Sequence, residues 1–322
     1  MSLVTFGLSG LVTLIVVFLL APRLKGAGIV ARDLHKPDQP QIPTMGGLAI
    51  IAGFSAGILL AVGLSAFLPS SLQVKQAELL ALLGTVLLIA IIGIIDDLLG
   101  MRQWAKALLP LVASLPLVAI KAGHTQMTIP LIWPVDFGIF YPLFLVPLGV
   151  TGAANAVNML AGFNGLEAGM GALAVASMAI IAYSIKSTTA LIIASSALGA
   201  LLATLYFNWY PAKVFIGDVG TLSIGAIIAS AVIIGNFEAA GVILIIPYAV
   251  DFLLKAKNRF PSSGWWGIYN DGKLYCPPNG PVGLCQLVMK IFGGIYERSL
   301  VLILIGLEEL LGLVAIGLYA RF

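Results

Sequence analysis

The feature that most constrains this chain is a series of apolar stretches, each about 20 residues long, that recur along its 322 residues. A helix of that length crosses the hydrocarbon core of a bilayer, which is about 30 Å thick. Only 10% of the residues are charged and 60% are hydrophobic, whereas a soluble domain carries about 25% charged residues. We therefore expect an all-α polytopic membrane protein, with one integral membrane domain over residues 1–322 and no separate soluble domain.

Ten membrane spans follow from this pattern. The first apolar stretch lacks a basic segment before it and a small-residue cleavage site after it, so it is interpreted as a span and not as a signal peptide. The predicted spans are residues 3–21, 46–67, 78–98, 107–122, 139–158, 168–186, 189–207, 219–236, 239–256 and 299–319.

Lysine and arginine divide unevenly between the two sets of connecting loops. One set carries 13 of the 17 cationic residues, and the other carries only Lys75, Lys121, Lys186 and Arg321. The positive-inside rule places the first set in the cytoplasm and both termini outside. The net charge of +3 does not suggest nucleic acid as a partner. Cys276 and Cys285 have no histidine nearby, so we interpret them as ordinary thiols and not as zinc ligands.

Polar side chains gather at the cytoplasmic ends of the predicted spans. Taken singly, each could be a helix cap, as Asp218 before an apolar helix could be. Together on one face, beside most of the cationic charge, they indicate a site at the membrane boundary. They are Asp96 and Asp97 after the third span, Asn155 and Asn158 in the fifth, Asn164 and Glu167 after it, and Asp218 before the eighth.

These residue types suit a phosphate-bearing substrate. Carboxylate and amide oxygens are hard ligands for Mg²⁺, which fills its remaining positions with phosphate and water. Lys106, Lys257 and Arg259 are cations that could meet phosphate oxygens. Glycines in residues 161–165 and 216–220 allow the backbone to approach a ligand closely. The combination is typical of phosphoryl transfer, in which catalysis is mostly positioning and charge neutralisation.

Three long motifs carry a family resemblance. They are IGIIDDLLGMRQWAKALLP (92–110), NAVNMLAGFNGLEAG (155–169) and NWYPAKVFIGDVGTLSIGA (208–226), preceded by IPTMGG (42–47). In order and spacing they resemble the signature loops of the polyprenyl-phosphate N-acetylhexosamine-1-phosphate transferases over nearly the whole chain. The stretches LPLVASLP (109–116) and KIFGGIYERSLVLILIGL (290–307) are most similar to the eukaryotic and archaeal branch that makes dolichyl-diphosphate N-acetylglucosamine.

The resemblance implies roles for nine residues. Asn158 and Asp218 would hold Mg²⁺, or Mn²⁺ in its place, against the diphosphate of a UDP-sugar. Asp96 and Asp97 would lie beside the metal and the lipid phosphate, with Asp96 deprotonating or orienting the attacking oxygen, and Lys106 would neutralise phosphate charge. A base is not obligatory, because a phosphate monoester is largely ionised at pH 7.

The remaining roles concern the donor. Asn164 would read the uracil edge, Phe215 would pack near the nucleotide, and Lys257 and Arg259 would supply cations to the diphosphate and sugar. The chain departs from the family where Lys257-Asn258-Arg259 replaces an Arg-His-Arg run and where Gly100 replaces an asparagine.

The implied activity is transfer of N-acetylglucosamine-1-phosphate from UDP-N-acetylglucosamine to dolichyl or another polyprenyl phosphate, with release of UMP. This is the first step of lipid-linked oligosaccharide synthesis for N-glycosylation. The partners are the two substrates and the lipid bilayer, and a homodimer is compatible with the sequence. The membrane would be the plasma membrane of an archaeon or the endoplasmic reticulum of a eukaryote, with a cytoplasmic active site.

Residues 257–298 are the expected sugar-recognition segment. The segment is rich in aromatics and turn formers, and no histidine follows His124, whereas the peptidoglycan branch has a histidine-rich motif there. An alternative is a transferase of another UDP-N-acetylhexosamine for cell-wall or surface glycans. A transporter is disfavoured because its polar site would lie at the midplane between repeats. Glu308 and Glu309, inside the tenth span, receive no role.

Overall fold

The computed structural model describes residues 1–67, 74–127, 135–261 and 264–319, and it is mostly helical. The helices are α1 (Ser2–Gly26), α2 (Gly47–Phe67), α3 (Gln76–Leu99), α4 (Gln103–Ala113), α5 (Leu115–Ala119), η1 (Tyr141–Leu145), α6 (Val146–Leu160), α7 (Leu166–Ser184), α8 (Thr188–Asn208), α9 (Gly217–Gly235), α10 (Glu238–Leu244), α11 (Ile246–Lys257), α12 (Leu284–Ile291) and α13 (Glu297–Tyr319). Antiparallel pairing joins β1 (Val30–Arg32) to β2 (Gln41–Pro43), β3 (Gln126–Met127) to β4 (Val135–Asp136), and β5 (Ile268–Asn270) to β6 (Lys273–Tyr275).

Within the described residues, eight helices are long and apolar enough to cross a membrane, and a ninth crossing results if α10 and α11, bent by 56°, count as one span. The predicted span 107–122 falls on α4 and α5, whose run Gln103–Ala119 is shorter than the eight. Ser114 separates these two helices, and Pro116, which has no backbone N–H to donate, lies in the first turn of α5. The polytopic helical membrane fold is confirmed, and the count of ten spans stays a prediction.

Helix α9 is the centre of the bundle. Its residues from Val219 to Gly235 are buried without interruption, as expected for a helix that is apolar all round and enclosed by others. It packs against α2, α3, α6, α7 and α8. Helix α9 is therefore the shared packing partner of these five helices.

Small residues bring the helices that carry polar ends close to α9. A Cβ atom added to Gly93 of α3 would lie 2.4 Å from the Cα of Val219, and one added to Gly47 of α2 would lie 2.3 Å from the Cα of Gly220. Such contacts require that no side chain intervenes, as is common between membrane helices. The contacts fix the ends of α2 and α3 against the first turn of α9.

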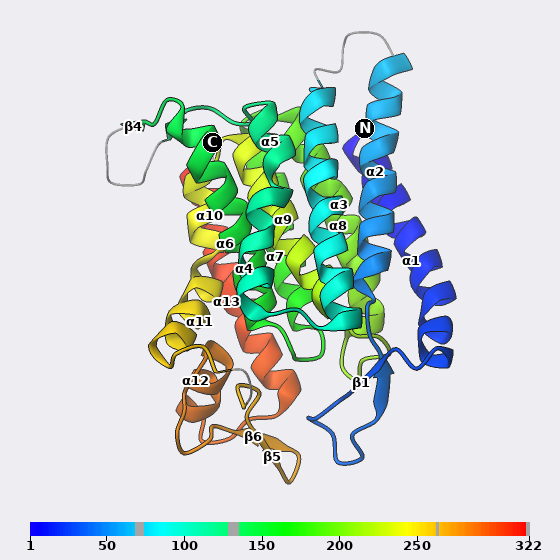
Figure 1. Ribbon diagram of the computed structural model, residues 1–322, viewed down its shortest axis with the longest axis vertical. Helices are drawn as coiled ribbons and strands as arrows, with labels where there is room; N and C mark the ends of the chain where they lie inside the picture. The colour runs from blue at the N-terminus through cyan, green and yellow to red at the C-terminus, as the bar shows by residue number, and fades with distance from the viewer. Residues whose placement is uncertain (68–73, 128–134, 262–263, 320–322) are drawn as a thin grey trace.

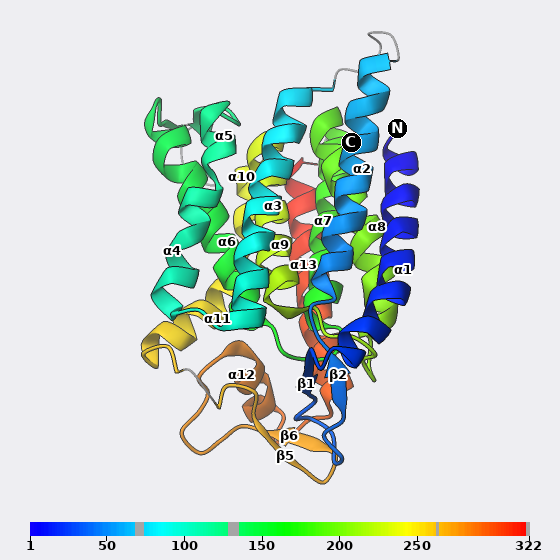
Figure 2. The ribbon, with the colours of Figure 1, turned by 45° about the vertical axis from the view of Figure 1, so that its right-hand side comes forward.

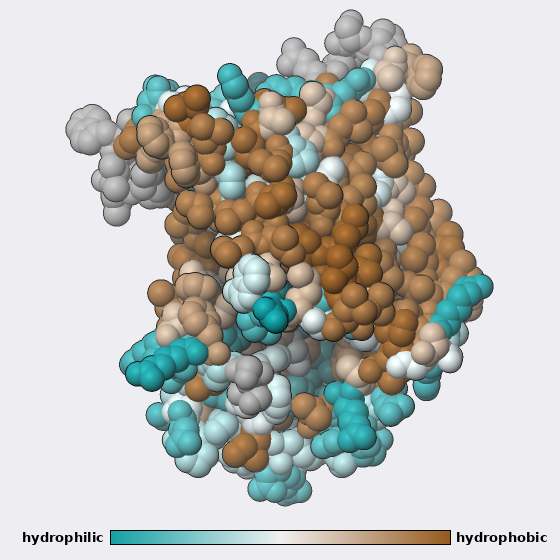
Figure 3. Space-filling model, viewed as in Figure 1, coloured by the Kyte–Doolittle hydropathy of each residue, from teal (hydrophilic) through white to brown (hydrophobic). Residues whose placement is uncertain are grey.

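The start of α1 and the end of α13 lie at one end of the bundle, and β1, β2, β5, β6 and α12 lie at the other (Figures 1 and 2). An apolar belt surrounds the helices, and hydrophilic residues gather at the end with the strands and α12 (Figure 3). Between belt and polar end, the surface is hollowed just below the ends of α3 and α4 (Figures 1 and 3). The helix ends above this hollow are the last turn of α3, which carries Asp96 and Asp97, and the first turn of α4, which carries Lys106.

Candidate active site

The neighbouring ends of α3, α4, α6 and α9 bring four of the predicted residues into one network. Lys106 Nζ lies 2.7 Å from Asp96 Oδ2 and 2.7 Å from Asp218 Oδ2. Asn158 Nδ2 donates to Asp218 Oδ1 at 2.5 Å and to Thr221 Oγ1 at 2.7 Å. We call Asp96, Lys106, Asn158 and Asp218 the central network. Thr221, one turn after Asp218 on α9, is a contact that the sequence reasoning missed.

Asp97 has a different position from Asp96. Its Oδ1 accepts a hydrogen bond from the backbone N–H of Asp218 at 2.9 Å, and its Oδ2 accepts one from the N–H of Val219 at 3.0 Å. These N–H groups lie in the first turn of α9 and have no acceptor within that helix. Asp97 therefore caps α9 from α3, where a carboxylate also meets the positive end of the helix dipole. Its main geometric effect is to hold Asp218 in place.

The neighbouring acids keep Lys106 positively charged. Burial alone would lower the pKa of Lys106, but the neighbouring carboxylates of Asp218 and Asp96 outweigh it and raise that pKa above its ordinary value. The side chain is therefore a stable ammonium between two acids. A cation in this position can also meet phosphate oxygens.

The central network fits a hard divalent ion. Asp96, Asp218 and the Asn158 carbonyl offer oxygen donors from three helix ends, and Mg²⁺ needs only one or two protein groups beside phosphate and water. In the observed arrangement, the nitrogen of the Asn158 amide faces Asp218. A half-turn of that amide would place its oxygen there instead, since the two ends have nearly the same shape.

Asn164 lies outside the central network and is 2% exposed. Its Oδ1 accepts from the Ala212 N–H at 2.7 Å, and its Nδ2 donates to Asp33 Oδ2 at 3.2 Å. Its backbone N–H donates to Glu297 Oε1 at 2.9 Å. Direct reading of a uracil edge by this amide would require these bonds to be exchanged, so that role stays a prediction.

Phe215 is half-buried at the approach to α9. Its N–H donates to the Pro43 carbonyl at 2.8 Å, and its own carbonyl accepts from the Gly46 N–H at 2.8 Å. These bonds join the motif of residues 42–47 to the motif that contains Asp218. The two motifs, far apart in sequence, thus form one wall of the site region.

Lys257 and Arg259 are exposed at the end of α11. Across residues 1–67, 74–127, 135–261 and 264–319, neither side chain forms a hydrogen bond or ion pair with the central network. The buried cation of α11 is Lys255, which the sequence reasoning missed. Its Nζ lies 2.8 Å from Asp251 Oδ2 and donates to the carbonyl of Met159, next to Asn158.

Lys255 also joins the expected sugar-recognition segment to the site. Its Nζ lies 5.2 Å from the ring centre of Trp265, and a Cβ added to Gly162 would lie 2.9 Å from the same ring. Asp251 accepts from the Leu284 N–H at 2.8 Å, at the start of α12. The spacing of four residues between two charged groups in an apolar helix was the signal that could have revealed the pair.

Comparison with known proteins identifies the family of this chain and several relatives. The model of the family described as glycosyl transferase family 4 matches residues 79–236, which contain all of the central network. A protein of Saccharolobus solfataricus, provisionally named UDP-N-acetylglucosamine–dolichyl-phosphate N-acetylglucosaminephosphotransferase, is 39% identical over 91% of this chain and 88% of its own length. A Dictyostelium discoideum protein that has this name without the provisional label is 28% identical over 98% of this chain and 87% of its own length. A phospho-N-acetylmuramoyl-pentapeptide-transferase of Halalkalibacterium halodurans is 36% identical over 81% of this chain and 86% of its own length.

Proposed function

The chain belongs to glycosyl transferase family 4, and we propose that it transfers N-acetylglucosamine-1-phosphate from UDP-N-acetylglucosamine to dolichyl phosphate or a similar polyprenyl phosphate. The products would be UMP and a lipid-linked N-acetylglucosamine diphosphate, the first intermediate of a lipid-linked oligosaccharide. The names of the archaeal and Dictyostelium relatives support the donor and the acceptor. The observation that carries the proposal is Lys106 held between Asp96 and Asp218 at the end of an apolar bundle.

In the proposed reaction, an oxygen of the lipid phosphate attacks the phosphorus nearest the sugar. The bond from this phosphorus to the oxygen that bridges the diphosphate breaks, and UMP leaves with that oxygen. Asn158 and Asp218 would hold Mg²⁺, which when bound would neutralise diphosphate charge. Lys106 meets the phosphate oxygens, Asp96 orients Lys106, and Asp97 keeps Asp218 aligned through α9. Asp96 need not remove a proton, since the acceptor phosphate is largely ionised at pH 7.

We place the active site on the cytoplasmic face. The polar end of the bundle carries the loops with most of the lysine and arginine residues, and such loops stay in the cytoplasm. A UDP-sugar can then reach the hollow from water, while the lipid acceptor can reach it from the bilayer.

Residues 257–298 would recognise the sugar. Trp265 lies against Gly162, directly after the end of α6 that carries Asn158. Gln286 is fully buried and fixes the segment by donating to the Gly264 carbonyl at 2.7 Å and accepting from the Val282 N–H at 2.9 Å. An aromatic ring in this position offers a flat apolar surface to a sugar ring.

The test uses purified protein, dolichyl phosphate and UDP-N-acetylglucosamine labelled in the sugar. One UMP should be released for each labelled sugar that enters the lipid fraction, and Asp218→Ala should release none above background. UDP as the stoichiometric product would instead show attack at the anomeric carbon and would refute the proposed bond cleavage. Equal labelling by other UDP-N-acetylhexosamines would support a surface-glycan enzyme.

A further inference from the structure

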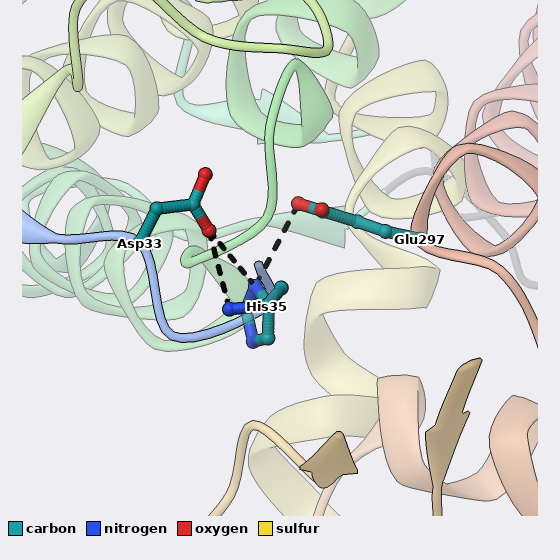
Figure 4. Close-up of side chains that lie close together, drawn as sticks. All are labelled: Asp33, His35 and Glu297. Carbon is teal, nitrogen blue, oxygen red and sulfur yellow. Dashed lines mark hydrogen bonds and ion pairs between the residues drawn. The ribbon is translucent and has the colours of Figure 1, made fainter. Parts of the chain in front are cut away.

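A buried ionic cluster lies apart from the central network. It consists of Asp33, His35, Lys36 and Glu297, all of them buried. Asp33, His35 and Lys36 belong to the connection from β1 to β2, and Glu297 is the first residue of α13. Figure 4 shows Asp33 and Glu297 pointing toward His35 from opposite sides. The chain therefore brings charged groups from its first and last thirds together in its interior.

The three residues Asp33, His35 and Glu297 lie close enough for a metal ion, but their neighbours argue against one. Lys36 Nζ lies 3.2 Å from Asp33 Oδ2 and 2.5 Å from Glu297 Oε2. The backbone N–H of His35 donates to Asp33 Oδ1 at 3.2 Å. Each carboxylate oxygen of the cluster therefore has a hydrogen-bond donor, and the Lys36 ammonium supplies the cation.

Both acids of the cluster also bind Asn164. Asp33 accepts from its side-chain amide and Glu297 accepts from its backbone N–H, while Ala212 donates to the remaining amide oxygen. Charge-assisted hydrogen bonds of this kind are stronger than neutral ones. Asn164 is thus held from three segments that are distant in sequence.

The neighbours of Asn164 in the turn of residues 162–165 are fixed as well. The Gly162 N–H donates to Glu167 Oε1 at 2.5 Å, and the Gly165 N–H donates to Asn208 Oδ1 at 3.1 Å. The Phe163 ring stacks on His35 with ring centres 4.6 Å apart and planes 8° apart. Gly162 and Gly165 have φ values of +126° and +84°, which residues other than glycine rarely adopt. The cluster and the glycines together impose one conformation on this turn.

The position of the turn decides which substrate it serves. It follows the end of α6, whose last turn carries Asn158, and lies with the loops at the polar end of the bundle (Figure 1). The water-soluble donor enters from this side, whereas the acceptor lipid approaches from the apolar belt. A turn held rigidly on this side would therefore serve the donor.

We infer that Glu297, Lys36 and Asp33 are positioning residues, which set the affinity for the UDP donor by holding the turn of residues 162–165. The inference rests on the proposed function for the identity of the donor. Lys36 pairs with both Asp33 and Glu297, so its removal leaves two buried carboxylates without their cation. That loss is more damaging than removal of Lys36 together with the charge of Glu297. The donor affinity should therefore respond to the balance of charge inside the cluster.

The experiment measures UDP binding by calorimetry and the two KM values of the transferase reaction on purified protein. Glu297→Gln should weaken UDP binding and raise the KM for UDP-N-acetylglucosamine by about tenfold or more, the loss expected for a charge-assisted hydrogen bond. The KM for dolichyl phosphate should stay within about twofold of wild type, the margin of such measurements. Lys36→Met combined with Glu297→Gln should weaken UDP binding by less than the product of the two single effects.

Two further variants complete the experiment, one as an alternative test and one as a control. Asp33→Asn tests the cluster with a smaller change if Glu297→Gln does not fold, and it should also raise the donor KM selectively. Glu78→Gln breaks the Lys75–Glu78 pair, 3.0 Å long, at the other end of the bundle and should leave UDP binding unchanged.

Several results would overturn the inference. Variants with a lowered kcat and unchanged UDP affinity would show a merely structural cluster. One equivalent of zinc in the wild-type protein, lost in Glu297→Gln, would show a metal site instead. If wild-type protein binds UDP but transfers no sugar phosphate, the proposed function fails while the binding comparison still decides this inference. Wild-type protein that does not bind UDP would refute it outright.

Discussion

At the scale of single residues, the two neighbouring aspartates of α3 show how position divides labour between identical side chains. Asp96 pairs with Lys106, whereas Asp97 is occupied by the first N–H groups of α9. Sequence alone places both acids at the end of a span, and only the family resemblance singled out Asp96. The capping role of Asp97 was not predictable, because its partners come from α9. The three-dimensional arrangement makes Asp97 a residue that acts through Asp218.

The central network leads to a prediction about metal dependence. Asp218→Ala or Asn158→Ala should lower turnover by several orders of magnitude, because the diphosphate would lose the ion that neutralises its charge. EDTA should abolish wild-type activity, and added Mg²⁺ or Mn²⁺ should restore it, as measured by UMP release. The chelator should not inhibit a metal-independent enzyme, and near-normal turnover of the Asp218 variant would remove the central assignment.

Glu308 allows a prediction about stability. It is fully buried in α13, and neither carboxylate oxygen has a hydrogen-bond partner among the residues that the structure describes. An unpartnered buried polar group costs about 1–3 kcal/mol. Glu308→Leu should therefore raise the free energy of unfolding by a similar amount, seen as a higher melting temperature in detergent. The neighbouring Glu309 is exposed, and Glu309→Leu is the control. A lower melting temperature for Glu308→Leu would reveal a stabilising partner or bound water.

At the scale of helices, the sequence predicted the long apolar elements and missed their interruptions. Eight predicted spans correspond to single long helices or, for Tyr141–Leu160, to a continuous helical run. The bend between α10 and α11 was hidden because composition reports how apolar a segment is and not its direction. Pro247, in the first turn of α11, was the available signal.

The site residues also divide into those that the sequence predicted and those whose contacts it could not predict. The residues of the central network were predictable because each ends or begins an apolar helix on the cationic face. The contact between Lys36 and Glu297 was not predictable, since the two residues are separated by 261 positions and each resembles an ordinary flanking charge. Asn164 was identified from its motif, but its three bonds depend on how distant loops fold over it.

Close helix contacts give a prediction at this scale. Gly47→Ala places a Cβ 2.3 Å from the backbone of Gly220, so α2 and α9 must separate. Such overpacking costs about 1–3 kcal/mol, and turnover should fall because the start of α9 carries Asp218. Gly63→Ala, in the same helix with no heavy atom within 4 Å of the new Cβ, should gain up to about 1 kcal/mol from helix propensity. Thermal unfolding in detergent measures the stability of the two variants, and UMP release measures their turnover. Equal effects of the two variants would contradict the close packing.

For the whole molecule, the separation of an apolar belt from a cationic polar end predicts orientation (Figure 3). In a background with Cys276 and Cys285 replaced by serine, cysteines introduced beside Lys75 or Lys186 should react with an impermeant maleimide on intact cells or sealed vesicles of known sidedness. A cysteine beside Lys213 should react only after permeabilisation. The reverse pattern would place the hollow on the side that cytoplasmic UDP-sugars do not reach.

The last prediction concerns the choice between donors, because relatives of both branches share more than a third of their aligned residues with this chain. We expect UDP-N-acetylglucosamine to label the lipid fraction and UDP-N-acetylmuramoyl-pentapeptide to fail. No histidine follows His124, so residues 257–298 lack the histidine-rich motif of the peptidoglycan branch. That segment instead folds back on the site through Trp265, Lys255 and the buried Gln286.

This arrangement suits a compact sugar. Trp265 already contacts the turn at Gly162, and the Trp266 ring lies 5.0 Å from the Trp265 ring, centre to centre. The aromatic pair therefore lies beside the turn that follows α6, and we expect it to pack against a compact sugar and to exclude a pentapeptide. Parallel assays with each labelled donor and dolichyl phosphate measure the selectivity, and Trp265→Ala should lower it by raising the KM for UDP-N-acetylglucosamine. Efficient transfer from the pentapeptide donor, or equal use of UDP-glucose, would place the chain in a different branch of the family.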